Sequence, residues 1–295
     1  MQPFLNDSQT VLMAGAGGGY DVFCGLPLYQ WLTSRGKTVH LVNLSFSPCI
    51  NTPLLKVEPG VCEEKYFPEK HLANFLQQPI YAILNDGPAI VEQAYQALVK
   101  ELTPDTLLLI DGGTDILMRG DEEDLGTPEE DISSLLAAHD SEIPNKYLLC
   151  LGFGIDAFHG ICHAHFLENV AALIQDGGYL GAWSLNQGTP EFDLLRDAYT
   201  YTANHQRSSI VNSSIIAAVE GKFGDAHATP RTEGSELFIN PLMALYWAFH
   251  LDHVARRNLY LEQIRGIPSR IELGLKIEQF QALLSKSRPH RPIPC

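Results

Sequence analysis

Short apolar runs alternate along the chain with longer segments whose apolar residues recur at helical spacing. Each run stops at glycine or at polar residues, which is typical of a buried strand that ends at a turn. Strands that alternate with helices predict right-handed crossovers and a mostly parallel sheet. The predicted strands are residues 10–14, 37–44, 80–84, 106–110, 146–151 and 178–185.

This pattern predicts a Rossmann-like, doubly wound α/β fold with extra C-terminal helices. We expect a single domain over residues 1–295, with a sheet core in 1–203 and a mainly helical part, 204–295, packed on it. Residues 242–264 predict one long helix, and its apolar length indicates a homo-oligomer. Its core positions would be Leu245, Phe249, Val254 and Leu261. The other predicted helices are 89–102, 129–138, 166–174, 191–203, 210–219 and 269–284.

Polar or glycine residues follow every predicted strand. In a parallel sheet these strand ends share one edge, and an open α/β sheet binds its ligand there, where the strand order reverses. A buried carboxylate at that edge is costly unless it meets a ligand, a metal or backbone N–H groups. The residues at these ends are Gly15–Asp21, Asn43, Asn85, Asp86, Asp111–Asp115, Gly154, Asp156 and Asn186.

The segment 106–131, TLLLIDGGTDILMRGDEEDLGTPEED, carries the densest group of acids. Thr127 has the place of a helix N-cap, with Pro128 next and Glu130 at capping-box spacing. The acids 129–131 therefore have a structural explanation, since they complement a helix N-terminus. That explanation does not extend to the acids before the cap, which are Asp111, Asp115 and Asp121.

The first strand runs into a glycine loop, residues 15–19, which reads GAGGG. Glycines let a backbone approach a ligand closely, and the following helix start suits a phosphate. A tight strand-to-helix turn is the alternative interpretation. Asn43 stands where a Rossmann dehydrogenase carries an acid for the ribose, which argues against hydride transfer.

Two further groups have both a ligand interpretation and a local one. Asp156, His159 and His163 have donor atoms for a metal, or are local caps and solvated histidines. Arg207 and the serines beside it suit a phosphate or carboxylate, or they cap the helix that follows.

The net charge of −15 and the lack of a basic cluster argue against nucleic acid or an anionic membrane as partner. No positive segment followed by an apolar run marks a signal peptide, and no apolar stretch is long enough to span a bilayer. The six cysteines form no close CxxC pair. We therefore expect a cytoplasmic protein with reduced thiols.

Three segments carry a resemblance to a known family: GAGGGYDVFCGLP, DGGTDILMRGDEEDLGTPEED and LGFGIDAFHG. They resemble the family known as domain of unknown function 1152, and the likeness covers nearly the whole chain. That family implies no activity.

A second likeness is to the fold of sirtuins and deoxyhypusine synthase. The GAG of residues 15–17 followed by GLP at 25–27 is similar to the sirtuin loop that binds NAD. Asp115 corresponds to a sirtuin acid beside the nicotinamide, and Ser184 to a serine near the adenosine. The chain lacks the catalytic histidine, the zinc cysteines and the catalytic lysine of these enzymes, so deacylation and spermidine transfer are not expected.

Together these features predict an enzyme that binds NAD, ADP-ribose or a related phosphorylated nucleoside and cleaves or transfers at a glycosidic bond with carboxylates. One alternative is a metal-dependent hydrolase with Asp111, Asp115 and Asp121 on the metal. The other is a non-catalytic nucleotide sensor or scaffold. The catalytic candidates are Asp115, Asp111, Asp121 and Asp21. The ligand-binding candidates are Gly15, Gly17, Gly18, Gly19, Asn43, Gly112, Gly113, Thr114, Arg119, Gly154, Asp156 and Asn186.

Overall fold

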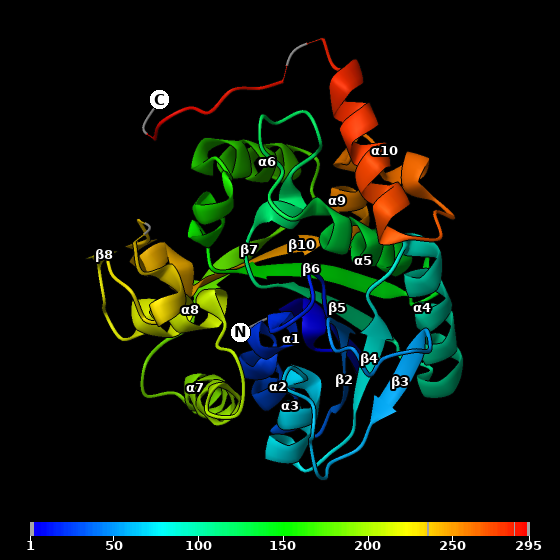
Figure 1. Cartoon of the computed structure of the whole chain (residues 1–295), viewed down its shortest axis with the longest axis vertical. Helices are drawn as coiled ribbons and strands as arrows, with labels where there is room; N and C mark the ends of the chain where they lie inside the picture. Colours follow the sequence, from blue (N-terminus) through cyan, green and yellow to red (C-terminus); the bar gives the residue numbers. More distant parts are fainter. Residues whose placement is uncertain (1–2, 235, 286, 294–295) are drawn as a thin grey trace.

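A computed structural model describes residues 3–234, 236–285 and 287–293 of the chain. Its central feature is an eight-stranded sheet with the order β3-β4-β2-β1-β5-β6-β10-β7 (Figure 1). The strands are β1 (Thr10–Gly15), β2 (Thr38–Ser45), β3 (Leu54–Val57), β4 (Ile80–Leu84), β5 (Thr106–Asp111), β6 (Asn145–Leu151), β7 (Tyr179–Ser184) and β10 (Leu245–His250). A separate pair, β8 (Gly224–Asp225) and β9 (Phe238–Ile239), forms a small second sheet.

The sheet is mostly parallel, as the alternation of strands and helices predicts. The pairs β1–β2, β1–β5, β2–β4 and β5–β6 are parallel. Two strands run against this direction: β3, at one edge, and β10, which lies between β6 and β7. The chain leaves β1 toward β2 and β4 on one side and returns through β5 and β6 on the other. The strand order therefore reverses between β1 and β5, as in a Rossmann-like sheet.

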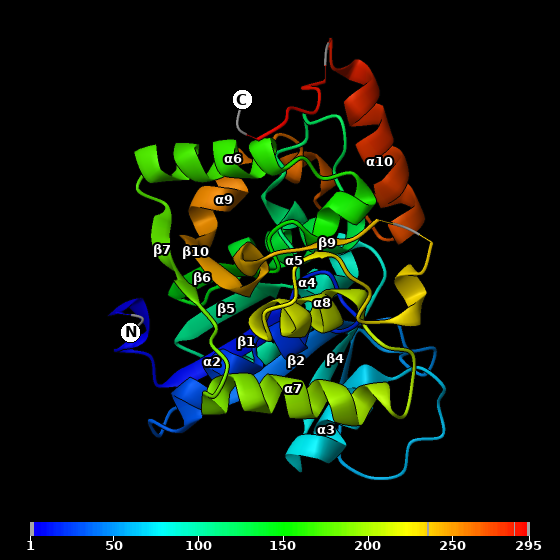
Figure 2. The same cartoon turned by 90° about the vertical axis from the view of Figure 1, so that its left-hand side faces the viewer.

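Helices cover both faces of the sheet. One core packs α4, α5, α6, α9 and α10 on one face, and a second packs α1, α2, α3, α7 and α8 on the other. Figure 1 shows α5, α6, α9 and α10 above the sheet, and Figure 2 shows α3 and α7 side by side below it. The helices are α1 (Asp21–Cys24), α2 (Leu26–Thr33), α3 (Pro68–Leu76), α4 (Pro88–Leu102), α5 (Pro128–Asp140), α6 (His163–Gln175), α7 (Pro190–Ala203), α8 (Ile210–Val219), α9 (Leu251–Arg257) and α10 (Arg270–Leu283). Short 3₁₀ turns lie at Pro3–Leu5, Asp115–Leu117, Ile155–His159, Pro230–Thr232, Pro241–Ala244 and Leu261–Ile264.

Residues along β1 alternate between the two cores. Val11 and Met13 join the core with α2, whereas Leu12 and Ala14 join the core with α5. Because β1 is covered on both faces, its apolar run is continuous, as expected for a central parallel strand. The carboxyl ends of β1 and β5 are thereby held firmly next to each other.

The predicted helix over 242–264 is wrong, because its first half is β10. Tyr246 and Ala248 face one core, while Trp247 and Phe249 face the other, which is strand alternation. Residues 245–249 are all apolar because the strand packs on both faces, and no glycine or proline separates β10 from α9, so neither a period nor a turn marks the strand in the sequence. The sheet thus takes one strand from beyond residue 203, and the helix on which the homo-oligomer prediction rested is a strand followed by α9.

The proline-rich segment 48–68 contains the short edge strand β3. Within the described residues, no helix combines the length and the apolar character that crossing a bilayer requires. The cysteines at 24, 49, 62, 150 and 162 are free, and Cys295 lies outside the described residues.

Candidate functional site

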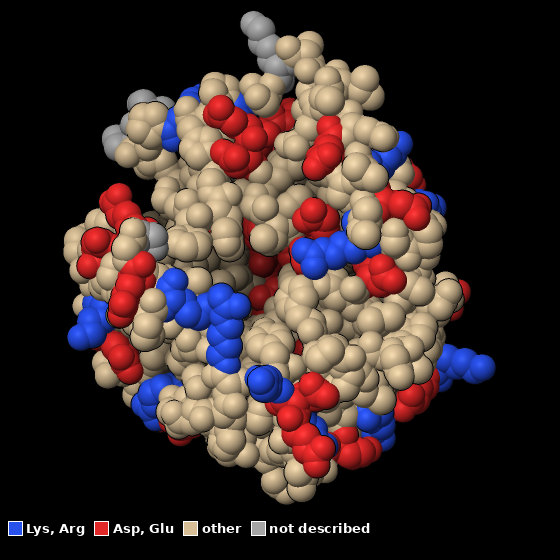
Figure 3. Space-filling view, in the orientation of Figure 1, with Lys and Arg blue, Asp and Glu red and all other residues tan. Residues whose placement is uncertain are grey.

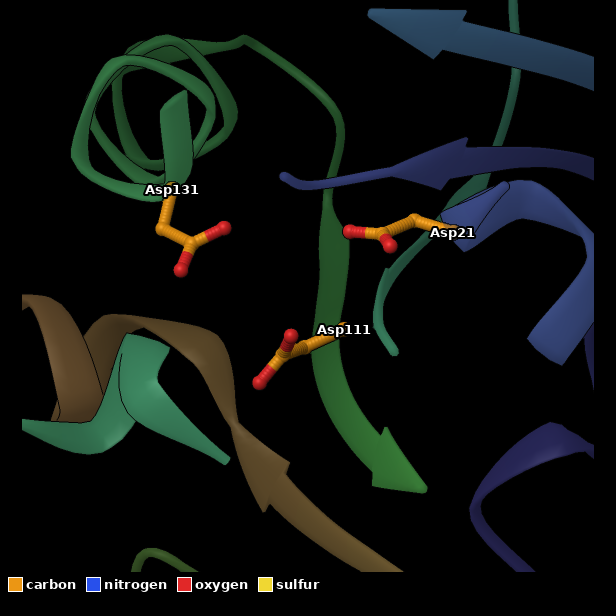
Figure 4. Close-up of side chains that lie close together, drawn as sticks. All are labelled: Asp21, Asp111 and Asp131. Carbon is orange, nitrogen blue, oxygen red and sulfur yellow. The ribbon is translucent and has the colours of Figure 1, made fainter. Parts of the chain in front are cut away.

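Three aspartates converge at the point where the strand order reverses. Asp21 opens α1 directly after the glycine loop of β1, Asp111 ends β5, and Asp131 lies in the first turn of α5. Figure 4 shows the three carboxylates pointing into one shared space from these three elements. One oxygen of each lies within 4.8 Å of one oxygen of the others. We call these residues the acid cluster.

The acid cluster is buried and incompletely bonded. Asp111 is 2% exposed and Asp131 is 3% exposed, while Asp21 is half-buried. The Oδ2 atoms of Asp111 and Asp131 have no hydrogen-bond partner in the described part of the chain. An unpartnered buried carboxylate oxygen is costly, so the cluster has acceptors available for a ligand.

Glycines make the room in which the carboxylates meet. A Cβ atom on Gly17 would lie 2.6 Å from Oδ1 of Asp131 and 2.8 Å from Oδ2 of Asp21. A Cβ on Gly112 would lie 2.8 Å from Oδ1 of Asp21. Any side chain at these two positions would therefore displace a carboxylate.

Asp115 and Asp156 hold the surrounding turns in place. Asp115 Oδ2 accepts hydrogen bonds from the backbone N–H and the hydroxyl of Thr127, at 2.8 and 3.0 Å. It thus caps α5, the helix that carries Asp131. Asp156 Oδ2 accepts from the backbone N–H of Thr114 at 2.5 Å, and its carboxylate fills the space beside Gly113. Both acids are buried.

The pKa values of the three cluster acids and of Asp156 are raised. Burial raises the pKa of Asp21 to about 7; the hydrogen bond from Gly17 opposes this and the charge of Asp115 adds to it. Burial, and then the charge of Asp115, raises the pKa of Asp111, Asp131 and Asp156 well above the ordinary value. Two ionised carboxylates at this separation repel by an energy of the order of 3–4 kcal/mol at an effective dielectric constant of about 20. The site therefore favours bound protons or a bound cation.

The glycine loop is fastened to the protein by its own N–H groups. Gly17 N donates to Oδ2 of Asp21 at 2.6 Å, and Gly19 N donates to the carbonyl of Leu44 at 3.2 Å. Asn43 bonds the loop as well, because its amide donates to the carbonyl of Gly19 at 2.9 Å. The carboxylate of Asp21 thus occupies an N–H group of the loop that was expected to hold a phosphate. Gly15 leaves space for the Asn43 side chain, and Gly18 and Gly19 have positive φ angles of 85° and 62°.

A buried glutamate supports Asn43 from behind. The Asn43 amide donates to Oε1 of Glu69 at 2.7 Å, while Oε2 of Glu69 has no partner among the described residues. Glu69 is 0% exposed, and burial raises its pKa to about 7, although the bond from Asn43 opposes the shift.

Several residues proposed from the sequence lie apart from the acid cluster. Asp121 pairs with Arg288, 2.8 Å from its Nη2, and with Arg119, 3.4 Å from its Nε. His159 is exposed in a 3₁₀ turn, whereas His163 opens α6 and lies against Gly154, so the two histidines do not share a helix face. Asn186 is exposed, and its side-chain amide donates to the Ser184 carbonyl in the same loop at 3.3 Å. Among the described residues, no metal-competent group contains these side chains.

Asp131 is the cluster member that sequence reasoning assigned to helix capping. Thr127 does begin α5 as predicted, but its side chain makes no capping bond and donates to Asp115 instead. Asp115 accepts the hydrogen bond from the Thr127 N–H group that Glu130 would accept in a capping box. Glu130 pairs instead with Arg270 at 2.7 Å. The spacing in the sequence does not single out Asp131, because a serine lies three residues after Glu130 as well as after Asp131. In the structure α5 is joined to the glycine loop by Ser134, which donates to the carbonyl of Ala16 at 2.7 Å.

Figure 3 shows acidic side chains on the floor of a hollow near the centre of one face, with Lys and Arg side chains on either side of its mouth. A negative floor inside a partly basic rim can hold a cation together with an anionic ligand.

The fold and the site define a Rossmann-like α/β protein with a carboxylate cluster at the point of strand-order reversal. Residues 60–272 match the profile of the family described as "Protein of unknown function (DUF1152)", which is well over half of the chain. The chain belongs to this family. The matched region contains Asp111 and Asp131, while Asp21 precedes it. A comparison with curated proteins gave no match.

Proposed function

We propose that this protein is a divalent-cation-dependent hydrolase that acts on a phosphorylated nucleoside. The observation that carries the proposal is the convergence of Asp21, Asp111 and Asp131, with unpartnered oxygens on the last two. Hard cations such as Mg²⁺, Mn²⁺ and Ca²⁺ prefer oxygen ligands at about 2.0–2.6 Å. Two ligands of one cation are separated by at most twice that distance, about 4–5 Å, which fits the spacing of at most 4.8 Å in the cluster.

The spacing favours this reaction over direct cleavage of a glycosidic bond. Glycosidases separate their two carboxyl groups by about 5 Å or more, to leave room for the sugar and, in inverting enzymes, a water. In the cluster, one oxygen of each of three carboxylates lies within 4.8 Å of one oxygen of the others, an arrangement of three acids around one point that suits a cation. The metal-dependent alternative is therefore better supported than the glycosidic one.

Each residue has a part in this proposal. The carboxylates of Asp21, Asp111 and Asp131 would hold the cation, and Asp115 would keep α5, and with it Asp131, in position. A bound cation supplies Lewis-acid assistance and lowers the pKa of a coordinated water. In hydrolysis of a diphosphate bond, the water oxygen bonds to one phosphorus and the P–O bond to the leaving phosphate breaks. A cluster carboxylate takes the water proton and passes it to the leaving oxygen, which balances the reaction.

The nucleoside part of the proposal is supported by the location of the site. Open α/β sheets bind nucleotides at the carboxyl ends of strands where the order reverses, and the acid cluster lies there. If the fold is similar to that of sirtuins or deoxyhypusine synthase, NAD or ADP-ribose would bind at this same place, where the strand order reverses. The absence of their catalytic histidine and lysine from this sequence favours a different reaction on a similar ligand.

Product analysis with NAD and with ADP-ribose tests the proposal. With Mg²⁺ or Mn²⁺, we expect AMP together with nicotinamide mononucleotide or ribose 5-phosphate. We expect EDTA to abolish the reaction and Asp111→Asn to slow it by about 100-fold or more. Release of nicotinamide with or without metal would instead support glycosidic cleavage. No turnover together with no cation binding would refute the proposal and leave the sensor interpretation.

A further inference from the structure

Two neighbouring arginines have no acidic partner among the described residues. Arg207 precedes α8 and Arg231 lies in the 3₁₀ turn Pro230–Thr232. Both are exposed, and in the described part of the chain neither guanidinium comes within ion-pair distance of a carboxylate. In a protein with 35 acidic and 20 basic residues, two neighbouring unpaired arginines are unexpected on a random surface. A ligand that supplies the missing negative charge would explain them.

Hydrogen bonds join these arginines to each other and to the glycine loop. The Nη1 atom of Arg231 donates to the carbonyl of Ser208 at 2.5 Å, which brings its guanidinium next to Arg207. The carbonyl of Arg207 accepts from the hydroxyl of Tyr20 at 2.9 Å, and Tyr20 directly precedes Asp21 of the acid cluster. The backbone of Arg207 is thus joined to Tyr20, the residue that precedes Asp21 in the sequence, and Arg231 is joined to Ser208, the residue after Arg207.

Tyr66 lies against the glycine loop. The hydroxyl of Tyr66 lies 3.1 Å from the place that a Cβ of Gly19 would take, so it covers the glycine loop. Burial raises the pKa of Tyr66; the charge of Asp21 adds to the shift and that of Arg231 opposes it. Tyr66 therefore shares one electrostatic environment with the cluster and with the arginine.

The arginines also repel each other. Burial, and then the charge of Arg207, lowers the pKa of Arg231. A pair of like charges held together by the fold is stabilised by an anion between them, and the forked guanidinium matches the oxygens of a phosphoryl group. Two positive charges correspond to the double charge of a phosphate better than to the single charge of a carboxylate.

We propose that Arg207 and Arg231 form a subsite that binds a phosphoryl group of the substrate at the rim of the hollow. This inference deepens the proposed function and rests on it for the identity of the site, because the second phosphoryl group of the same molecule would lie on the cation held by the acid cluster. The substrate class is accordingly a diphosphate, with one phosphoryl group on the arginines and the other over the carboxylates.

Calorimetric titration of the full chain with inorganic pyrophosphate tests the subsite. The titration is done in EDTA and again with Ca²⁺, on wild type, Arg207→Gln and Arg231→Gln. The control is Arg256→Gln, because Arg256 is equally exposed but lies 4.0 Å from Asp176. We expect the two subsite variants to bind pyrophosphate at least tenfold more weakly than wild type, the control to bind like wild type, and all four proteins to share one melting temperature within a few degrees.

Titration with Ca²⁺ alone separates the two proposals. Unchanged Ca²⁺ binding in both subsite variants is the expected result, since neither arginine touches the acid cluster. Equal pyrophosphate affinity in wild type and both variants, or no binding to wild type in either condition, would overturn the subsite while leaving the cation site intact. Absence of Ca²⁺ binding in wild type would overturn the proposed function, and the EDTA titration would still decide whether the arginines bind the anion.

Discussion

Asp121 and Asp131 are acids of the same stretch of chain with opposite surroundings. Asp121 is neutralised by Arg288, whereas Asp131 faces other carboxylates and has an oxygen without a partner in the described chain. A paired acid contributes an ion pair, but an unpaired buried acid costs folding energy until a ligand binds. The two residues therefore permit a matched comparison.

We expect Asp131→Asn and Asp121→Asn to affect the cation response differently. At pH 8 without metal, Asp131→Asn should raise the free energy of unfolding by about 1–2 kcal/mol, because it removes negative charge from a crowded buried site. The same variant should lose the increase in melting temperature that Mg²⁺ gives wild type. Asp121→Asn should keep that increase. Thermal unfolding with and without Mg²⁺ measures both, and the reverse pattern would show that the cation binds near Asp121.

Glu69 should make the metal-free protein less stable as the pH rises. Its pKa is about 7 in the folded state and 4.5 in the unfolded chain, so between these values the folded state holds the extra proton. Stability from this group is complete below pH 4.5 and is lost as the pH rises through 7, by an amount of the order of 3 kcal/mol.

Urea unfolding of wild type and Glu69→Gln at pH 5 and pH 8 checks this expectation. The variant should lose less stability between the two pH values than wild type does. Glu278→Gln, an exposed change on α10, should follow wild type. Identical losses in wild type and Glu69→Gln would show that the buried carboxylate is already ionised at pH 5.

At the level of elements, the glycine loop is a support for carboxylates. Gly17 lies close to the carboxylates of both Asp21 and Asp131. Its lack of a side chain therefore allows α1 and α5, which are far apart in sequence, to bring these two acids together. The loop resembles a phosphate-binding loop in composition, but the acceptor on its Gly17 N–H group is a carboxylate of the protein itself. A phosphate at that position would have to displace Asp21.

Gly17→Ala should separate the acid cluster. The added methyl would lie 2.6 Å from a carboxylate oxygen, which is closer than Cβ atoms approach, so Asp131 or Asp21 must move. We expect Mg²⁺ affinity to fall by about tenfold or more, as for changes to groups that orient metal ligands.

Gly274→Ala is the control for that substitution. Gly274 lies within α10, and its nearest neighbour would be 3.4 Å away, an ordinary contact. This change should leave Mg²⁺ affinity unaltered and raise the free energy of unfolding by about 0.5–1 kcal/mol, because alanine favours a helix. Equal affinities for both variants would contradict the role given to Gly17.

The sequence predicts local elements well where a glycine, a proline or polar residues mark their ends. β4 and α8 lie at their predicted residues, and Pro128 begins α5 as expected. β10 was missed because α9 follows it directly, with no turn residue to mark the end of the strand, so strand and helix read as one apolar segment. Asp131 was missed because its position in the first turn of a helix already offered a local role, as a helix-capping acid. Its neighbours in the structure are Asp21, after β1, and Asp111, at the end of β5, and their proximity depends on how the whole sheet is assembled. Asp111 and Asp21 were found because Asp111 lies at the end of a strand and Asp21 lies in the turn that follows another.

At the level of the whole molecule, the C-terminal tail closes over the acidic loop after β5. The backbone N–H of Arg288 donates to the carbonyl of Asp121 at 2.7 Å, and its side chain reaches the fully buried Glu122 at 2.6 Å. The same side chain contacts Glu168 of α6 at 2.7 Å. Figures 1 and 2 both show this tail passing close to α6. One arginine thus joins the tail, the loop and a helix.

Arg288→Met should destabilise the protein more than Arg291→Met. The first change removes a partner from a carboxylate with no solvent exposure, which costs about 1.5–3 kcal/mol because Asn169 and two backbone N–H groups remain bonded to Glu122. The second breaks an ion pair whose side chains are 54% and 45% exposed, worth less than about 1 kcal/mol. Urea unfolding compares the two variants, and equal losses would show that the Glu122 contact adds nothing.

The position of β10 has a consequence for the order in which the protein is built on the ribosome. Strands β1 to β6 pair with one another, so this part of the sheet can form once β6 has been synthesised. β7 pairs only with β10 in this sheet, and it therefore has no partner strand until residue 250 has been synthesised. Until then β6 is an open edge, which is a template for pairing with another chain. A chain that stops before residue 245 should therefore aggregate, although it contains the complete acid cluster.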